Sequence, residues 1–551
     1  MSLYSGKEME RLRDRVEALL EAGTALAEPL GRTISESAQC MRRRLESAEP
    51  CSDLLALEFV ETAWRLCLRL QREKDQSTGE AGERRLRIER SKLEVVAMLL
   101  PYALEMPCDD LFNLKRSHPR WQSLLSQVAY IPCKDLKSLQ AGLADMHRLM
   151  FLSGSALALG LRTANFTMKK LLTGSGVLYY GVKTEEAVQQ GRLNAACPTI
   201  PFLRLFLGLA ESSLCAALFD SLLPEIALSK RIYIPRGEED GLTPSEAFPA
   251  RLEQGDIRED EGNPKDYVAV RVISPFPLPA LQPIPTQSHW FLCCHSDQSL
   301  NPVPATSIIL HIHGGGWTAM SSHTHENHTR KWSLSTNAVV LSVDYRLAPE
   351  WPYPAAVQDC WAAYKWARQF AKRKLGLEAE KVVLAGDSAG GNLALAVAFK
   401  AIERGYQPPD GLLLIYPSLS TDLTRPTPSY LYSLEDFVLS HGIMRLSRES
   451  YLSPASDPHT DPLLSPLCAS DALLAQLPPV RLLIGSNDPL VDDSWRFFER
   501  LQRLHVNSSL TVFEGLSHGL LNFDFKLGLP EAQQAVTVAG QKLQELLHRL
   551  V

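Results

Sequence analysis

The sequence predicts an α/β protein in which a mostly parallel, doubly wound sheet follows a large and mainly helical amino-terminal domain. From residue 307 onward, short runs rich in β-branched residues and leucine alternate with longer stretches of helical periodicity. Strands that alternate with helices need right-handed crossovers, which place helices on both faces of a parallel sheet. Before residue 240, apolar residues recur instead at helical spacing over long stretches.

The composition fits a globular protein and excludes several classes. The chain has 551 residues, of which 45% are hydrophobic and 22% charged, and its net charge is −6. These values exclude a largely disordered chain, and the charge balance gives no reason to expect a nucleic-acid partner. The 11 cysteines are odd in number and form no C-x-x-C pair, so we expect free thiols in a reducing compartment.

Neither a signal peptide nor a transmembrane span is expected. Residues 1–23 lack the apolar core of a signal peptide. The 13 uncharged residues 149–161 are too few to cross a bilayer, and residues 201–220 are interrupted by Arg204 and Glu211. We therefore expect a cytoplasmic protein. Peripheral contact with a lipid droplet or a membrane is a hypothesis that rests on these two apolar stretches.

We divide the chain into three segments. Residues 1–240 form the helical domain, which begins with a capping-box pattern at Ser5 and Glu8. Residues 241–306 are acidic and then rich in proline, which removes the N–H groups that a sheet needs, so we expect edge strands and loops there. Residues 307–551 form the α/β domain.

Six strands are expected in the α/β domain. They are the runs SIILHIH, AVVLSVD, KVVLAG, GLLLIY, VRLLIG and SLTVFEG, and helices over 355–370 and 392–403 separate some of them. Reactive groups in such a sheet sit on the loops beyond the carboxyl ends of the strands.

The strongest motif is the sequence Gly386-Asp387-Ser388-Ala389-Gly390, which lies between a predicted strand and a predicted helix. A G-x-S-x-G sequence in that position is a nucleophile elbow, whose tight turn raises the serine hydroxyl above the sheet edge. We therefore predict Ser388 as the nucleophile.

A glycine-rich loop follows the first of the six strands. It reads His313-Gly314-Gly315-Gly316. Consecutive glycines let several backbone N–H groups point into one small volume, as an oxyanion hole requires. We predict donors at Gly315, Gly316 and Ala389, with Gly314 as a further candidate.

Two later strands end at the remaining members of a triad. Asp488 and His518 follow Ser388 in the order typical of α/β-hydrolases and not in either order found in the serine proteases. Asp492 and Asp493 compete with Asp488, and His505 is the weaker competitor of His518. Asp488 is favoured because it stands nearest to the end of its strand.

Five histidines gather near the glycine-rich loop, and they raise the question of a metal site. They are His311, His313, His323, His325 and His328. No carboxylate or cysteine arrangement in the sequence completes a ligand set, and a serine triad needs no metal. We expect no metal and no cofactor.

Together the segments HGGGW, SVDYRLAPE, GDSAGGN, NDPLVDD and SHG resemble the hormone-sensitive lipase family of α/β-hydrolases. The long helical first half also resembles the extra amino-terminal domain of hormone-sensitive lipase. The resemblance implies an α/β-hydrolase fold and a lipase that acts on acylglycerols or other neutral lipid esters in lipid catabolism. One departure is that only 100 residues separate Ser388 from Asp488, which leaves no room for the regulatory insert of the mammalian enzyme.

The resemblance further implies that several residues support the site without taking part in the chemistry. Asp344, Tyr345 and Arg346 brace the oxyanion loop, and a buried aspartate beside an arginine is expected to pair with it. His313 and Asp387 are the other supporting residues. Three alternatives stay open. They are a soluble esterase of small esters, a non-catalytic protein that binds small molecules on the same fold, and an interaction protein whose helical half is the working part.

Overall fold

The computed structural model describes the α/β part of the chain and several helices before it. The described residues are 118–161, 182–208, 216–236, 267–278, 307–377, 380–422, 427–434, 436, 438–525 and 528–548, with scattered positions elsewhere. The predicted helix that begins at Ser5 lies outside them.

Nine strands form one twisted sheet in the order β1-β9-β8-β7-β6-β4-β5-β3-β2. The strands from β1 to β5 in this order pair in parallel, whereas β3 pairs antiparallel with both β5 and β2. Their bounds are β1 Val128–Ile131, β2 Leu228–Pro235, β3 Tyr267–Ser274, β4 Ile308–Ile312, β5 Val339–Asp344, β6 Val382–Asp387, β7 Gly411–Ile415, β8 Val480–Gly485 and β9 Ser508–Phe513.

Strands β4 to β9 coincide with the six predicted runs, which confirms the α/β-hydrolase architecture of this part. The sheet nevertheless extends across the boundary predicted at residue 307. Strands β1, β2 and β3 come from the segments assigned to the helical domain and to the connection. Strand β3 lies in the connection, where edge strands were expected, although it is second from the edge of the sheet. Strand β1 was not recognised because it has only four residues, none of them fully buried.

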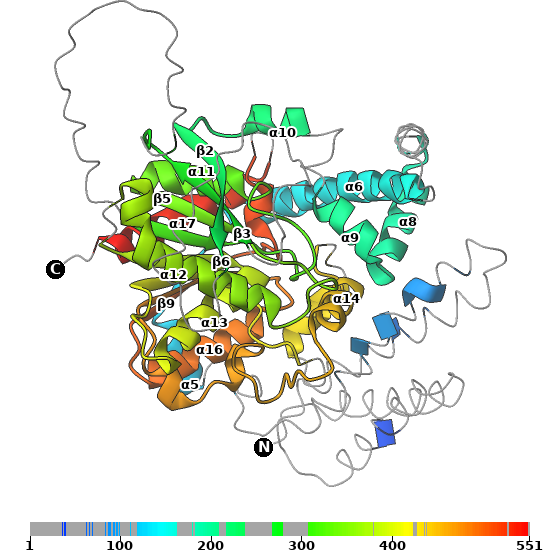
Figure 1. Ribbon diagram of the computed structural model, residues 1–551. Coiled ribbons are helices and arrows are strands. Elements are labelled where there is room, and N and C mark those ends of the chain that lie inside the picture. Colours follow the sequence, from blue (N-terminus) through cyan, green and yellow to red (C-terminus); the bar gives the residue numbers. More distant parts are fainter. Residues whose placement is uncertain are drawn as a thin grey trace, which may run out of the picture.

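Helices cover both faces of the sheet (Figure 1). Alternate strand residues point to opposite faces. Ile308 and Leu310 of β4 therefore join the core with α12 and α13, whereas Ile309 packs in the core with α11 and α17. The helices of the two layers include α11 Glu326–Thr336, α12 Ala355–Leu375, α13 Ala389–Glu403, α16 Val491–Arg503 and α17 Pro530–Leu547.

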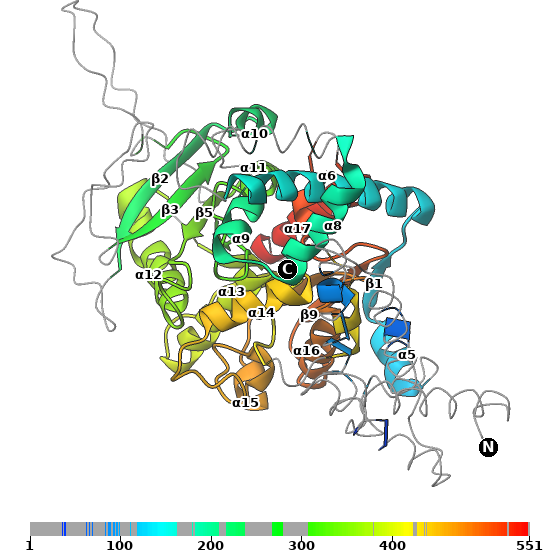
Figure 2. The same ribbon diagram turned by 90° about the vertical axis from the view of Figure 1, so that its right-hand side faces the viewer.

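A second group of helices lies beside the sheet (Figures 1 and 2). Helix α6 starts in the core at Leu139, close to α17, and continues outward to contact α8 and α9. Helix α14 packs in turn against α8. The bounds of this group are α6 Leu136–Gly160, α8 Thr184–Ala196, α9 Ile200–Leu207 and α14 His441–Tyr451. The other described helices are α5 Pro119–Leu125, α10 Ala216–Leu222 and α15 Asp471–Leu474, with the 3-10 helices η4 Pro428–Leu434, η5 Pro466–Cys468 and η6 Leu520–Phe523.

The two apolar stretches considered as membrane spans fall on these helices. Residues 149–161 end α6, and residues 201–220 include α9 and part of α10. Among the described residues, no helix combines the length and the apolar character that crossing a bilayer demands.

Candidate active site

Ser388 occupies a strained turn between β6 and α13. Its φ of 54° lies in the left-handed region, which for a side chain larger than that of glycine costs about 1–3 kcal/mol. Neighbouring strands hold the turn, because the Ser388 N–H donates to the Ile415 carbonyl at 2.9 Å and the Ser388 carbonyl accepts from the Ser418 N–H at 3.0 Å. The turn places the hydroxyl at the carboxyl edge of the sheet.

Gly390 allows the turn to approach β4 closely. A Cβ atom at this position would lie 1.9 Å from the Ile312 carbonyl oxygen and 2.7 Å from that of His313. The elbow and the start of the glycine-rich loop are therefore in backbone contact, which explains why this position needs glycine.

We predict that Gly390→Ala destabilises the protein strongly. Both clashing atoms belong to the backbone of a central strand and cannot rotate away, so the free energy of unfolding should fall by about 3 kcal/mol or more. Denaturant titration measures this fall. The matched control is Gly154→Ala in helix α6, where the added Cβ would meet only the rings of Phe206 and Phe202, at 3.4 and 3.6 Å. Equal stability of the two variants would contradict the close approach.

The structure brings Ser388, His518 and Asp488 into one hydrogen-bonded chain. The His518 Nε2 atom lies 2.9 Å from the Ser388 Oγ atom, and the His518 Nδ1 atom lies 2.8 Å from the Asp488 Oδ2 atom. All three side chains are buried. The second Asp488 oxygen accepts the Leu490 N–H at 2.8 Å, which fixes the carboxylate.

The electrostatic surroundings of His518 favour a side chain that can hold a proton. Burial by itself lowers the pKa of His518, but the Asp488 carboxylate outweighs it and raises this pKa above the ordinary value.

Neither of the competing aspartates, Asp492 and Asp493, takes part in this hydrogen-bonded chain. Asp492 accepts the Ser429 N–H at 2.7 Å, and burial raises the pKa of both Asp492 and Asp493. His505 lies at the end of α16, with a φ of 57°.

The glycine-rich loop forms a tight turn next to Ser388. The N–H groups of Thr318 and Ala319 both donate to the Gly315 carbonyl at 3.1 Å. Gly315 and Gly316 adopt positive φ angles of 98° and 60° and line the same pocket as Ala389, at the first turn of α13. Helix starts leave N–H groups without acceptors inside the helix.

Gly314 differs from the other predicted donors. Its N–H donates to the Asp387 Oδ1 atom at 3.1 Å, and the His325 Nε2 atom lies 3.4 Å away on the same side. This group is therefore engaged within the protein, and the geometry favours Gly315, Gly316 and Ala389 as the oxyanion donors. Asp387, the residue before Ser388, ties the elbow to the loop.

The supporting residues brace the glycine-rich loop, but their hydrogen-bond and ion-pair partners differ from those that the sequence suggested. The Tyr345 hydroxyl donates to the His313 carbonyl at 2.9 Å, and the two rings stack at 4.2 Å. Burial lowers the pKa of His313 to about 4, so this ring is neutral.

The expected pairing of Asp344 with Arg346 is wrong. The Asp344 carboxylate instead accepts the Ser322 N–H and hydroxyl at 2.6 and 2.9 Å, beyond the glycines. Arg346 pairs with Asp359 at 2.9 Å. Asp344 is the last residue of β5, whereas Arg346 lies beyond the strand, where the regular strand geometry no longer holds the two side chains together.

Arg204 on helix α9 is a functional candidate that the motifs did not reveal. Its guanidinium donates to the carbonyl oxygens of Thr318 and Ala348 at 2.9 and 3.0 Å and pairs with Glu350. The helix thereby holds the outer side of the oxyanion turn. The only signal in the sequence was a charged residue within an apolar stretch.

We predict that Arg204→Leu lowers kcat by roughly 10- to 100-fold with a small change in KM, because displacing the oxyanion donors slightly is costly. Steady-state kinetics on a soluble ester measures the separate changes in kcat and KM. Glu350→Gln is the control, because it removes only an exposed ion pair, worth about 0–1 kcal/mol. A kcat in Arg204→Leu that matches Glu350→Gln would mean that α9 merely covers the site.

Ser388 lines a mostly apolar pocket that is open to solvent. The walls of the pocket come from helix α9, the glycine-rich loop, helix α14 and the segments on either side of α14. The apolar lining residues are Leu207, Trp317, Met320, Val438, Leu439, Ile443, Met444 and Leu490.

Comparison with known proteins places the chain in a family. A family model described as the alpha/beta hydrolase fold matches residues 309–522. The esterase LipI of Mycobacterium tuberculosis is 34% identical over 268 residues, which make up 48% of this chain and 79% of that protein. Hormone-sensitive lipase of Bos taurus is 39% identical over 155 residues, 28% of this chain and 20% of that protein.

A solved esterase structure from Pyrobaculum calidifontis is 26% identical, with a TM-score of 0.49 over 63% of this chain and 93% of that one. Because of the family model and the sequence relatives, the chain belongs to the hormone-sensitive lipase family of α/β-hydrolases, a family of carboxylic-ester hydrolases.

Proposed function

We propose that this ester hydrolase cleaves acylglycerols or other neutral lipid esters and that Ser388 is its nucleophile. The observation that carries the proposal is the hydrogen-bonded chain from Asp488 through His518 to Ser388, which ends in a pocket with mostly apolar walls. Such a chain activates a hydroxyl that is otherwise a weak nucleophile.

The proposed reaction follows the triad mechanism. As the Ser388 Oγ atom attacks the ester carbonyl carbon, its proton passes to the His518 Nε2 atom at 2.9 Å. Asp488 stabilises the resulting imidazolium and keeps its Nδ1–H oriented. His518 then gives the proton to the departing alcohol, which leaves an acyl group on Ser388, and water cleaves this acyl-enzyme by the same route.

Backbone N–H groups bind the tetrahedral oxyanion in this proposal. Gly315 and Gly316 supply donors from the loop, and Ala389 supplies one from the start of α13, where the helix dipole favours negative charge. Loss of one such donor in comparable sites costs about 10²–10³-fold in kcat. No residue in this scheme requires a cofactor.

Two features support a lipid substrate. The walls of the pocket combine aliphatic and methionine side chains from α9 and α14, which suit an acyl chain. The helical elements also expose apolar side chains to solvent, among them Leu149 in α6 at 62% and Val182, next to α8, at 83%. Such side chains suit contact with a lipid surface.

Hydrolysis assays with purified protein test the substrate class. We expect cleavage of both p-nitrophenyl butyrate and emulsified diacylglycerol. Cleavage of the short ester alone would favour a soluble esterase. Failure to cleave either by a well-folded protein would favour a binding function on this fold.

Flotation with neutral-lipid emulsions tests the surface contact. We expect the wild-type protein to float with the emulsion and the double variant Leu149→Ser, Val182→Ser to remain in solution, with its activity on the short ester unchanged. If the wild-type protein stays in solution, the droplet hypothesis fails while the esterase proposal stands.

A further inference from the structure

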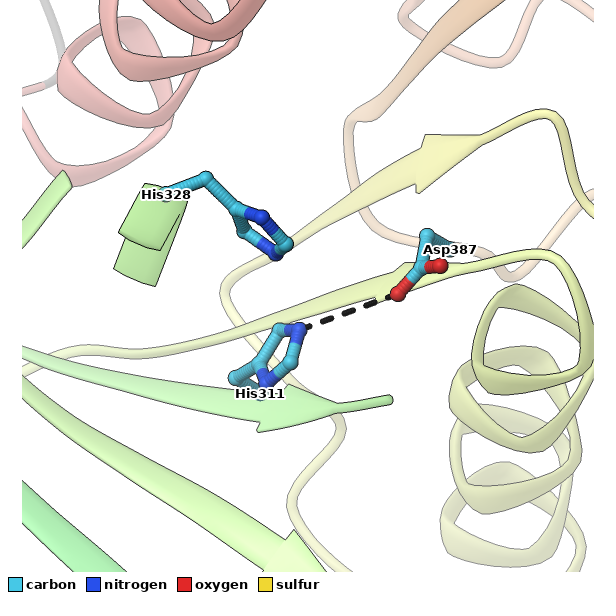
Figure 3. A group of neighbouring side chains, drawn as sticks. All are labelled: His311, His328 and Asp387. Carbon is cyan, nitrogen blue, oxygen red and sulfur yellow. Dashed lines mark ion pairs between the residues drawn. The ribbon is translucent and has the colours of Figure 1, made fainter. Parts of the chain in front are cut away.

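A buried cluster of imidazole groups surrounds Asp387 behind the nucleophile elbow. Figure 3 shows His311 on β4, His328 on α11 and Asp387 at the end of β6, with their side chains turned toward one another. None of the three is more than 3% exposed. His325 completes the cluster, with its Nε2 atom 3.3 Å from the Asp387 Oδ1 atom.

Among the described residues, two imidazole nitrogens of this cluster lack a hydrogen-bond partner, although one of them, the His311 Nε2 atom, forms a long ion-pair contact of 3.8 Å with the Asp387 Oδ1 atom (Figure 3). The His311 Nδ1 atom is 2.7 Å from the Ser342 hydroxyl oxygen. Within the described part of the chain, however, neither the His311 Nε2 atom nor the His328 Nε2 atom has a hydrogen-bond partner. An unsatisfied polar group in such a place costs about 1–3 kcal/mol, so two that face one carboxylate call for an explanation.

The geometry around His311 and Asp387 favours a bound cation. If His311 donates its Nδ1 proton to Ser342, its Nε2 lone pair faces the Asp387 Oδ1 atom at 3.8 Å. A lone pair directed at a carboxylate is repelled unless a positive charge lies between them.

We propose that His311 Nε2, His328 Nε2 and a carboxylate oxygen of Asp387 bind a Zn²⁺ ion. The three donor atoms lie within 4.8 Å of one another. Zinc bonds of about 2.0–2.2 Å place the donors of a tetrahedron about 3.4 Å apart, so the side chains close inward by about 1 Å when the ion binds. The His325 Nε2 atom, which lies 3.3 Å from the Asp387 Oδ1 atom, is a candidate for the fourth donor.

The donor types select the metal. Neutral imidazole and carboxylate suit zinc and its neighbours in the first transition row, whereas calcium and magnesium take oxygen ligands. The Ser342 hydroxyl at His311 Nδ1 is the outer partner that orients a histidine ligand. The histidines had suggested a metal site in the sequence, but the carboxylate that completes the ligand set was not recognised, because it lies 59 residues beyond His328 in the chain.

The ion has a structural role in this proposal. It joins α11 and β4 to Asp387, which also accepts the Gly314 N–H of the oxyanion loop. The residue after Asp387 is the nucleophile itself, so the site fixes the elbow and the loop relative to each other. It takes no part in the ester chemistry.

Metal analysis of the purified full chain tests the site. The protein is refolded with ZnSO₄ and dialysed against metal-depleted buffer, because a buried ion exchanges slowly. Mass spectrometry should then find about one zinc ion per folded wild-type chain. Refolding with a strong chelator instead of zinc should lower Tm, and refolding with Co²⁺ should produce the visible absorption of a four-coordinate cobalt site.

Three variants distinguish a loss of zinc binding from a loss of folding. His328→Phe preserves an aromatic ring beside Trp332 and should bind at least 10-fold less zinc. Ser342→Ala keeps every ligand and removes only the orienting hydroxyl, for which we expect 10- to 100-fold weaker affinity. His441→Phe, a buried histidine on α14, is the control and should retain the ion.

A folded wild-type chain that holds no zinc after this treatment would overturn the proposal, since a buried water would then bridge the two nitrogens. Equal zinc in His328→Phe and in the wild-type protein would overturn it as well. Both results are independent of ester hydrolysis, because metal content is read in the folded protein whether or not it cleaves a substrate.

Discussion

Substitution of Ser388 by alanine should lower kcat for a soluble ester by about 10⁶-fold, the size of effect seen when a triad nucleophile is removed. The hydroxyl is the only group of this side chain that contacts His518, and alanine cannot replace it. The residual rate would come from the oxyanion donors and from substrate binding, which the substitution leaves in place. Active-site titration with burst kinetics measures the fall.

Two controls make this result specific to the nucleophile. A serine-directed organophosphate should label the wild-type protein at Ser388 and leave Ser388→Ala unlabelled. The unfolding midpoint of the variant should stay close to that of the wild-type protein, because alanine meets the same strain at a φ of 54°. Labelling at another serine together with retained activity would mean that the nucleophile lies elsewhere.

The local parts of the site could be predicted because each depends on a short segment. The elbow at Ser388 combines glycines with a buried strand, and Asp488 and His518 each follow a strand of the same sheet. Since parallel strands present their carboxyl ends at one edge, recognising the strands was enough to bring these residues together.

The contacts between distant segments could not be predicted. Arg204 reaches the oxyanion turn from a helix more than 100 residues earlier, and nothing in the local pattern distinguishes it from a solvated arginine. The partner of Arg346 is Asp359 in helix α12, although Asp344 stands nearer in the sequence. Such pairs depend on how the elements pack, which periodicity does not encode.

The same limit applies to the extent of the fold. Strand β3 is second from the edge and pairs over eight residues with β2, yet prolines and an acidic loop surround it in the sequence. Strand β1 adds only four residues beside β9. Strand β1 buries little apolar surface, so its hydrophobic pattern is weak and tertiary pairing decides its structure.

The second large effect is expected at Asp488. Asp488→Asn should lower kcat by about 10⁴-fold, because an asparagine can stabilise the wrong tautomer of His518 and carries no charge to offset the imidazolium. Asp492→Asn on α16 is the control and should leave kcat close to the wild-type value, since its carboxylate binds the Ser429 N–H and not the histidine.

The pH profile distinguishes this role from a purely structural one. Only neutral His518 can accept the serine proton, so the activity of the wild-type enzyme should rise with pH through an apparent pKa above 6.5. In Asp488→Asn the carboxylate that raises this pKa is gone and the effect of burial remains, so the acid limb of kcat/KM should move to lower pH. Asp436, whose carboxyl also interacts with His518, offers a comparison, because Asp436→Asn should move the limb in the same direction but by less. An unchanged acid limb in Asp488→Asn would mean that a different carboxylate governs the histidine.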